Sequence, residues 1–167
     1  MCPDWQMCGG RQGRRRHLLG LTTHRRGAGR ELRQCPEKEI GNFPITLTTE
    51  GQANEKFAHF GDTLEVGHWH NDMPGLTEGA KIIAVSEGCP RQIVEYSDRV
   101  YGFQCHMELT PTVIEALIAA TEVDLAKLKD HRFVQQPDTL RANEYHAMNR
   151  KLFGFLDKLV ETYVRAP

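Results

Sequence analysis

His106 and Glu108, a histidine and a carboxylate two residues apart, are the side chains best spaced for acid–base chemistry in this 167-residue chain. They close an apolar, β-prone run at residues 99–105. On an extended strand, residues i and i+2 point to the same face, so the imidazole and the carboxylate lie side by side. Such a pair supplies the general base and its orienting group in a nucleophilic triad. The nucleophile must come from elsewhere in the chain.

The composition bounds the class of protein. The length predicts one domain with a core of its own. No apolar run approaches the roughly 20 residues of a membrane span, and the start of the chain has no apolar segment typical of a signal peptide. The five cysteines are odd in number and fit no zinc spacing. We therefore expect a reduced, cytoplasmic protein rather than a secreted disulfide framework.

The charge is divided unevenly along the chain. Residues 1–34 carry eight arginines against two acidic residues, a balance of +6, whereas the remainder carries 13 basic and 20 acidic residues, a balance of −7. Taken alone, the first segment is typical of a disordered basic arm that binds nucleic acid or an acidic surface. Because no aromatic residues interleave with the arginines of residues 11–33, nucleic-acid binding is the less favoured interpretation.

The remaining sequence predicts an α/β protein with strands first and helices last. Short β-prone runs separated by turn residues suit a sheet meander. These runs are residues 43–48, 63–67, 80–85, 92–96 and 99–105. A polar turn is expected at residues 50–55, and a polar loop at residues 68–72.

Helix signals begin after the last strand. Thr110 and Pro111 provide an N-cap and a first helical residue, and Asp138 is expected to cap a later helical segment. Two apolar stripes are predicted to face the core. In the first helix they are Val113, Leu117 and Ile118, and in the terminal helix they are Leu152, Phe155, Leu156, Leu159, Val160 and Tyr163.

The run Gly102-Phe103-Gln104-Cys105-His106-Met107-Glu108 resembles the G-x-Q-F-H-P-E signature of class I glutamine amidotransferases, which include the glutaminase domain of GMP synthase and its stand-alone relatives. Upstream, His70-Asn71-Asp72 is similar to the S-H-x-D segment of the same domains. The resemblance extends from Pro36 to Thr110, and Cys105 and Met107 replace the usual Phe and Pro. It implies a three-layer, flavodoxin-like α/β fold, a parallel sheet with an antiparallel extension, incomplete at the N-terminus.

The resemblance also implies a reaction. A cysteine attacks the side-chain amide of glutamine, His106 acts as the base, and Glu108 orients the imidazole. His70, Asn71 and Asp72 would bind the substrate glutamine. No cofactor is implied, and the acceptor of the ammonia would belong to a separate synthetase partner. A metal site at His68, His70 and Asp72 is the competing interpretation, but no third ligand is convincingly spaced, so no metal is expected.

The nucleophile is missing from the expected place. The family pattern requires a G-x-C-L-G-x-Q segment before residue 36, and none exists. Cys2 and Cys8 lack flanking glycines, and Cys35 precedes a proline, which opposes continuation into a helix. Cys105 adjoins the catalytic histidine, so strand alternation points its thiol to the opposite face.

A shift of the reading frame by one base would account for the missing nucleophile segment. Codons exist for Arg16-His17-Leu18-Leu19-Gly20 whose shifted frame reads G-I-C-L-G, with the cysteine at Leu18. We therefore predict that residues 1–34 are an out-of-frame or otherwise non-native segment, and that residues 35–167 are the C-terminal part of an amidotransferase domain. Such a chain would be inactive. A natural basic arm, or a non-catalytic relative, are the alternatives.

Overall fold

The computed structural model of this protein describes residues 32–164. Five strands form one sheet in the order β2-β1-β3-β4-β5, with every neighbouring pair antiparallel. The strands are β1 (Arg33–Leu47), β2 (Thr63–Met73), β3 (Lys81–Val85), β4 (Ile93–Ser97) and β5 (Val100–Phe103). All five predicted strands are therefore present. The first begins ten residues earlier than expected, just before the predicted domain boundary at residue 35.

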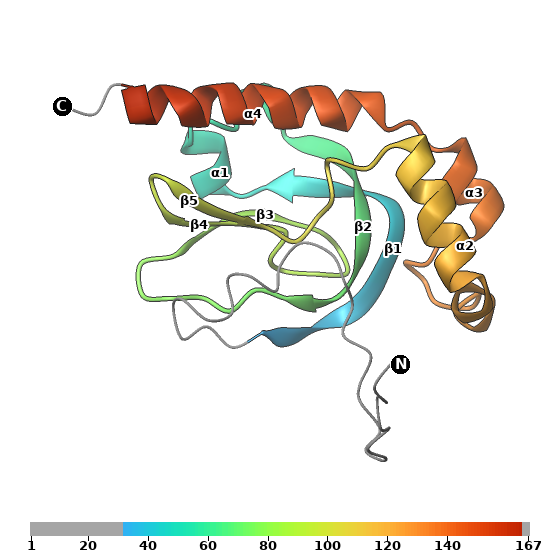
Figure 1. The fold of residues 1–167 in the computed structure, drawn as a ribbon. Coiled ribbons are helices and arrows are strands. Elements are labelled where there is room, and N and C mark those ends of the chain that lie inside the picture. The colour runs from blue at the N-terminus through green and yellow to red at the C-terminus, as the bar shows by residue number, and fades with distance from the viewer. Residues whose placement is uncertain (1–31, 165–167) are drawn as a thin grey trace, which may run out of the picture.

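The sheet curls upon itself (Figure 1). β1 and β2 pair over most of their lengths, with a register shift between Gln34 and Glu39 that contains Pro36. A proline has no N–H to donate to the ladder, so a bulge is where a strand tolerates it. The segment after β5 returns to β2, the strand at the other edge, through an antiparallel bridge between Gly67 and His106. This bridge brings the predicted histidine onto β2.

Helices cover the sheet at one side and one end (Figure 1). They are α1 (Thr49–Ala53), the 3-10 turn η2 (Ala58–Phe60), α2 (Pro111–Lys127), α3 (Pro137–Ala142) and α4 (His146–Val164). The predicted start of α2 is confirmed, because the Thr110 side chain accepts a hydrogen bond from the Val113 N–H and Pro111 is the first helical residue.

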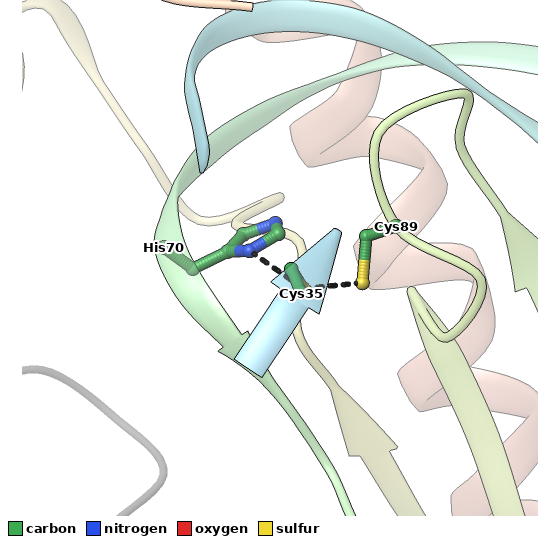
Figure 2. Close-up of side chains that lie close together, drawn as sticks. All are labelled: Cys35, His70 and Cys89. Atoms are coloured by element: carbon green, nitrogen blue, oxygen red, sulfur yellow. Dashed lines mark hydrogen bonds between the residues drawn. The ribbon is translucent and has the colours of Figure 1, made fainter. Parts of the chain in front are cut away.

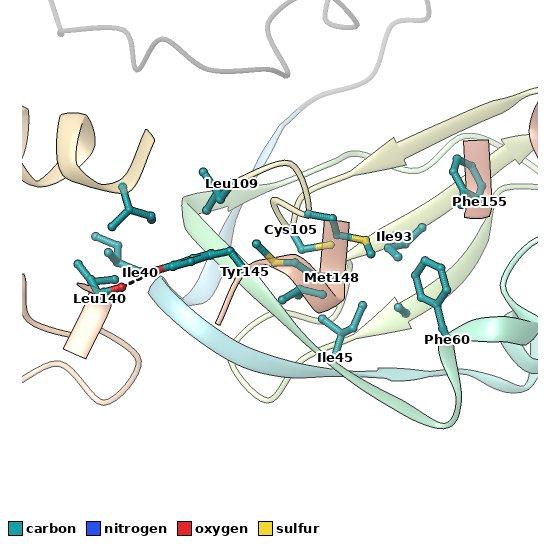
Figure 3. Close-up of a cluster of buried hydrophobic side chains, with 14 of the residues drawn as sticks. Ile40, Ile45, Phe60, Ile93, Cys105, Leu109, Leu140, Tyr145, Met148 and Phe155 are labelled. Carbon is teal, nitrogen blue, oxygen red and sulfur yellow. Dashed lines mark hydrogen bonds between the residues drawn. The ribbon is translucent and has the colours of Figure 1, made fainter. Parts of the chain in front are cut away.

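Helix α4 packs one face onto the sheet and leaves another uncovered. Met148 and Phe155 are buried in the core together with Ile45 and Ile93 (Figure 3). The other face carries large apolar side chains that are more than 40% exposed, which are Phe153, Leu156, Val160, Tyr163 and Val164. The single apolar side predicted for this helix is therefore divided between core and surface.

Several local predictions were wrong. Residues 68–72 belong to β2 instead of a loop, and residues 50–55 include α1 because the Thr48 side chain caps its first turn. Asp138 lies within the first turn of α3, whose N-cap is Gln136. On α2, the buried positions are Ile114, Ile118 and Leu125, and Val113 is exposed.

Parallel pairing within residues 32–164 is confined to a bridge between Ile40 and Val134. These residues therefore form the antiparallel extension of the expected sheet. No helix among the described residues is long and apolar enough to cross a membrane.

Candidate functional site

His106 and Glu108 form a close pair on the outside of the curled sheet. The Nδ1 atom of His106 lies 2.7 Å from Oε1 of Glu108. The imidazole side chain is 12% exposed and the carboxylate side chain 58% exposed. We call these two residues the outer pair. Their spacing places both side chains on one face, as alternation along an extended segment requires.

The backbone of the outer pair is fixed from two sides. The His106 N–H donates a 2.7 Å hydrogen bond to the Gly67 carbonyl of β2. From α4, the Asn149 side-chain amide donates to the carbonyls of Met107, at 2.5 Å, and Leu109, at 3.1 Å. Gly67 is required here because a Cβ atom would lie 2.7 Å from the His106 carbonyl oxygen and 2.5 Å from a Leu109 methyl group. The chain can therefore hold the imidazole in one place.

The contact with His106 determines the electrostatics of the Glu108 carboxylate. Burial raises the pKa of Glu108, but the hydrogen bond and charge of His106 lower it by more, so the pKa lies below its ordinary value. The carboxylate is the hydrogen-bond partner of Nδ1, and the Nε2 atom makes no hydrogen bond with residues 32–164.

Cys105 lies on the other side of the backbone from the outer pair. Its side chain is buried in the apolar core with Met107 and Leu109, while the residues between them face outward. Burial raises the pKa of the Cys105 thiol, so the reactive thiolate is disfavoured. The structure thus separates this thiol from His106, its sequence neighbour.

His70, Asn71 and Asp72 lie on β2 and differ in exposure. The imidazole of His70 is buried and faces inward, Asn71 is half-buried, and Asp72 is exposed at the point where β2 pairs with Gln34 of β1. Strand alternation turns His70 and Asn71 to opposite faces. No hydrogen bond joins any of the three to the outer pair within the described part of the chain.

A group of polar side chains lies inside the curl of the sheet, all of them buried except Ser86, which is half-buried. We call it the inner cluster, and it comprises Glu39, His68, His70, Ser86 and Gln92. The Glu39 carboxylate is fully buried and accepts hydrogen bonds from the Ser86 hydroxyl, at 2.7 Å, and the Gln92 amide, at 2.6 Å. Its Oε2 atom lies 3.3 Å from His70 Nε2 and 3.6 Å from His68 Nδ1.

Burial governs the charges of the inner cluster. It lowers the pKa of His68 to about 4 and that of His70 to about 3, and the charge of a protonated His106 lowers both further. Burial also raises the pKa of Glu39, against the opposing hydrogen bonds from Ser86 and Gln92. At neutral pH, both imidazoles are therefore uncharged.

Two cysteines adjoin the inner cluster. Cys35 of β1 and Cys89, in the connection between β3 and β4, have their sulfur atoms 2.7 Å apart, and the Cys35 sulfur lies 3.8 Å from His70 Nδ1 (Figure 2). We call them the thiol pair. Their hydrogen bond raises the pKa of Cys35, the donor, and lowers that of Cys89, the acceptor.

Sequence reasoning did not find the inner cluster. Its members come from β1, β2 and the ends of β3 and β4, so no local spacing connects them. The alternative metal set of His68, His70 and Asp72, which the sequence did not favour, does not assemble, because exposed Asp72 is absent from both groups of ligand atoms that lie within 4.8 Å of one another. Those groups are Cys35, His70 and Cys89, and Glu39, His68 and His70.

The predicted nucleophile position, Leu18, lies outside the described residues, as do Cys2 and Cys8. The free thiols within residues 32–164 are those of Cys35, Cys89 and Cys105, and all three are buried. None of them is hydrogen-bonded to His106.

Comparison with known proteins gives consistent matches. A family model described as glutamine amidotransferase class-I matches residues 19–125. The glutamine amidotransferase-like protein YfeJ of Salmonella typhimurium is 54% identical over 131 residues, which cover 78% of this chain and 55% of that protein. The chain thus spans about half the length of this curated relative.

Solved structures give the same result. The crystal structure of SMU.1228c matches with a TM-score of 0.76 and 44% identity. A glutamine amidotransferase from Thermotoga maritima matches with a TM-score of 0.67 and 26% identity. Each match covers 80% of this chain and 56% of the other.

Proposed function

This chain belongs to the class I glutamine amidotransferase family, and from that premise we propose that residues 35–167 are the C-terminal part of a glutaminase domain. The chain has the mixed α/β fold of that family. In this proposal, His106 and Glu108 are the base and the orienting acid of a Cys-His-Glu triad. The observation that carries it is the 2.7 Å contact of the outer pair, which leaves Nε2 of the imidazole ready to accept a proton.

The proposed reaction assigns each proton to an atom. Nε2 of His106 takes the proton of the cysteine thiol, and the thiolate attacks the side-chain carbonyl carbon of glutamine. The carbon–nitrogen bond of the tetrahedral intermediate then breaks, and His106 returns the proton to the leaving ammonia. Water hydrolyses the thioester to glutamate by the same base. Glu108 stabilises the imidazolium that forms in each half of the reaction.

We further propose that this chain alone is inactive. The buried thiols of the described residues cannot approach the outer pair, so the nucleophile has to come from the preceding segment. In this proposal, a shift of the reading frame by one base would supply that cysteine at the position of Leu18, next to the start of the family match at residue 19. The alignment with YfeJ spans 131 of the 167 residues, which leaves out a length about equal to residues 1–34.

The uncovered face of α4 supports an incomplete domain. Phe153 is 63% exposed and Val160 59% exposed on a helix whose other face is in the core. Large apolar patches exposed on a soluble protein usually mark a surface against which another segment or protein packs. We propose that a part of the domain that lies outside the matched region in the relatives packs there.

The glutamine would lie near the accessible side chains of Asn71 and Asp72, with His70 behind them, and the ammonia would pass to a separate synthetase partner.

The test has two parts. The nucleotide sequence of codons 1–36 is expected to spell G-I-C-L-G when read one base out of step at Arg16–Gly20. The protein translated in that restored frame is expected to release ammonia from glutamine and to lose this activity on His106→Ala, whereas the present chain releases none.

Two outcomes contradict the proposal. His106-dependent ammonia release by the present chain would show that a nucleophile is already available. A shifted frame without the cysteine would remove the proposed nucleophile, and salt-dependent retention of the chain on DNA would then favour the natural basic arm.

A further inference from the structure

Three potential metal ligands converge beside the inner cluster from separate parts of the chain. The sulfur of Cys35, the sulfur of Cys89 and Nδ1 of His70 all lie within 4.8 Å of one another. Figure 2 shows Cys35 between the His70 ring and the Cys89 side chain, with a dashed line to each. Two thiolates and an imidazole are the ligand types that zinc prefers in proteins.

The hydrogen bonds determine which ring nitrogen of His70 carries the proton and which has a lone pair directed at the thiol pair. Nε2 of His68 lies 3.2 Å from the Phe43 carbonyl oxygen, which can only accept, so this nitrogen carries the proton. Nδ1 of His68 is then an acceptor, and it lies 3.3 Å from Nε2 of His70. The proton of His70 is therefore on Nε2. Its Nδ1 atom presents a lone pair toward the Cys35 sulfur at 3.8 Å.

Glu39 completes an arrangement that is typical of metal sites. Its Oε2 atom lies 3.3 Å from His70 Nε2, within ion-pair distance, while Ser86 and Gln92 donate hydrogen bonds to the carboxylate. A metal-ligating histidine usually donates its second ring N–H to such a carboxylate, which orients the ring and raises its basicity. The inner cluster provides this support before any ion binds.

We propose that Cys35, Cys89 and His70 Nδ1 bind a thiophilic divalent cation of the zinc class, with Glu39 as the supporting carboxylate. Binding replaces the two thiol protons, which are released to solvent, so the ion neutralises two thiolates. Zinc–sulfur bonds of about 2.3 Å in a tetrahedral site require sulfur atoms roughly 3.8 Å apart. The thiols therefore rotate apart by about 1 Å from their present contact. The fourth position is left for water or an external ligand.

The proposed metal site shares His70 with the proposed glutamine site but does not rest on the glutaminase reaction. Its test uses the whole chain with Cys2 and Cys8 replaced by serine. Under reducing conditions, cobalt(II) is expected to bind with one-to-one stoichiometry, giving thiolate-to-cobalt charge-transfer absorption and the visible bands of a tetrahedral site. Zinc is expected to displace it. Cys35→Ser, Cys89→Ser and His70→Gln should each abolish the bands, and Glu39→Gln should weaken zinc binding about 10- to 100-fold.

Cys105→Ser is the matched control, because that thiol is equally buried but lies in the apolar core. It should leave cobalt binding unchanged, and circular dichroism checks that each variant folds. X-ray absorption of the zinc-loaded chain, which needs no further variant, should give two sulfur ligands. A shell of only nitrogen and oxygen overturns the proposal. So does a reduced chain that binds no cobalt and, when oxidised by glutathione disulfide, joins Cys35 to Cys89.

Discussion

The outer pair and the inner cluster each contain a glutamate beside a histidine, and they differ in their exposure to water. In both, a carboxylate lies beside an imidazole, at 2.7 Å for Glu108 and His106 and at 3.3 Å for Glu39 and His70. The pKa of Glu108 lies below its ordinary value, because its interactions with His106 outweigh burial. The pKa of Glu39 lies above its ordinary value, because burial outweighs the hydrogen bonds it accepts.

This contrast suits the two groups to different chemistry. The outer pair keeps an ionised carboxylate next to an accessible imidazole, as a proton-transfer group requires. The inner cluster keeps neutral imidazoles in a fixed hydrogen-bond network, which suits ligand positioning and structural support. The His-x-His segment of β2 and the His-x-Glu segment after β5 have the same spacing. Burial, rather than spacing, distinguishes their chemistry.

Substituting the two carboxylates gives the largest expected difference. Glu39→Ala removes the acceptor of the Ser86 hydroxyl and the Gln92 amide in a buried site, and we expect the free energy of unfolding to fall by about 3 kcal/mol. Glu108→Ala, at a carboxylate that is 58% exposed, should change it by less than about 1 kcal/mol. Urea unfolding followed by circular dichroism measures both. Equal losses would remove the distinction between the two regions.

Gly67 lies where the two regions meet, next to His68 and against the His106 carbonyl. We expect Gly67→Ala to cost about 2 kcal/mol, because the added Cβ forces the segment of the outer pair away from β2. Gly79→Ala is the control, since a Cβ there meets no atom within 4 Å and only its φ of +77° opposes the change, at about 1 kcal/mol. A smaller loss at Gly67 than at Gly79 would contradict the close packing. The NMR signals of the His106 ring should move only in the first variant.

The sequence was sufficient for features that depend on local spacing. The Thr110 cap and the proximity of His106 to Glu108 follow from rules that connect residues a few positions apart. All five strands were located, although β1 and β2 extend beyond their predicted limits because apolar periodicity does not report a strand through polar residues. His68 and His70 look like loop residues in the sequence, yet the sheet buries them beside Glu39.

The inner cluster could not be predicted from the sequence, for a different reason. Cys35 and Cys89 lie next to the hydrogen bond from the Glu37 N–H to the Gly88 carbonyl, and only tertiary structure connects positions so far apart. Glu39 resembles any charged residue in a strand, since alternation along β1 defines two faces without saying which one is inside. The register shift after Gln34 further removes the local pattern. Long-range pairing therefore determines this part of the molecule.

The smallest expected effect is the pH dependence of the outer pair. Because the pKa of Glu108 in the folded chain lies below its ordinary value of 4.5, the unfolded chain binds its proton first as the pH falls. The stabilisation is thus fully present above about pH 4.5 and is lost as the pH falls through the folded pKa. Glu108→Gln should remove this contribution, so its difference in unfolding free energy from the unchanged chain should be below about 1 kcal/mol at pH 6 and should shrink as the pH falls below 4.5. A difference that grew toward acid would mean that the carboxylate is destabilised beside His106, and the outer pair would then resemble the inner cluster.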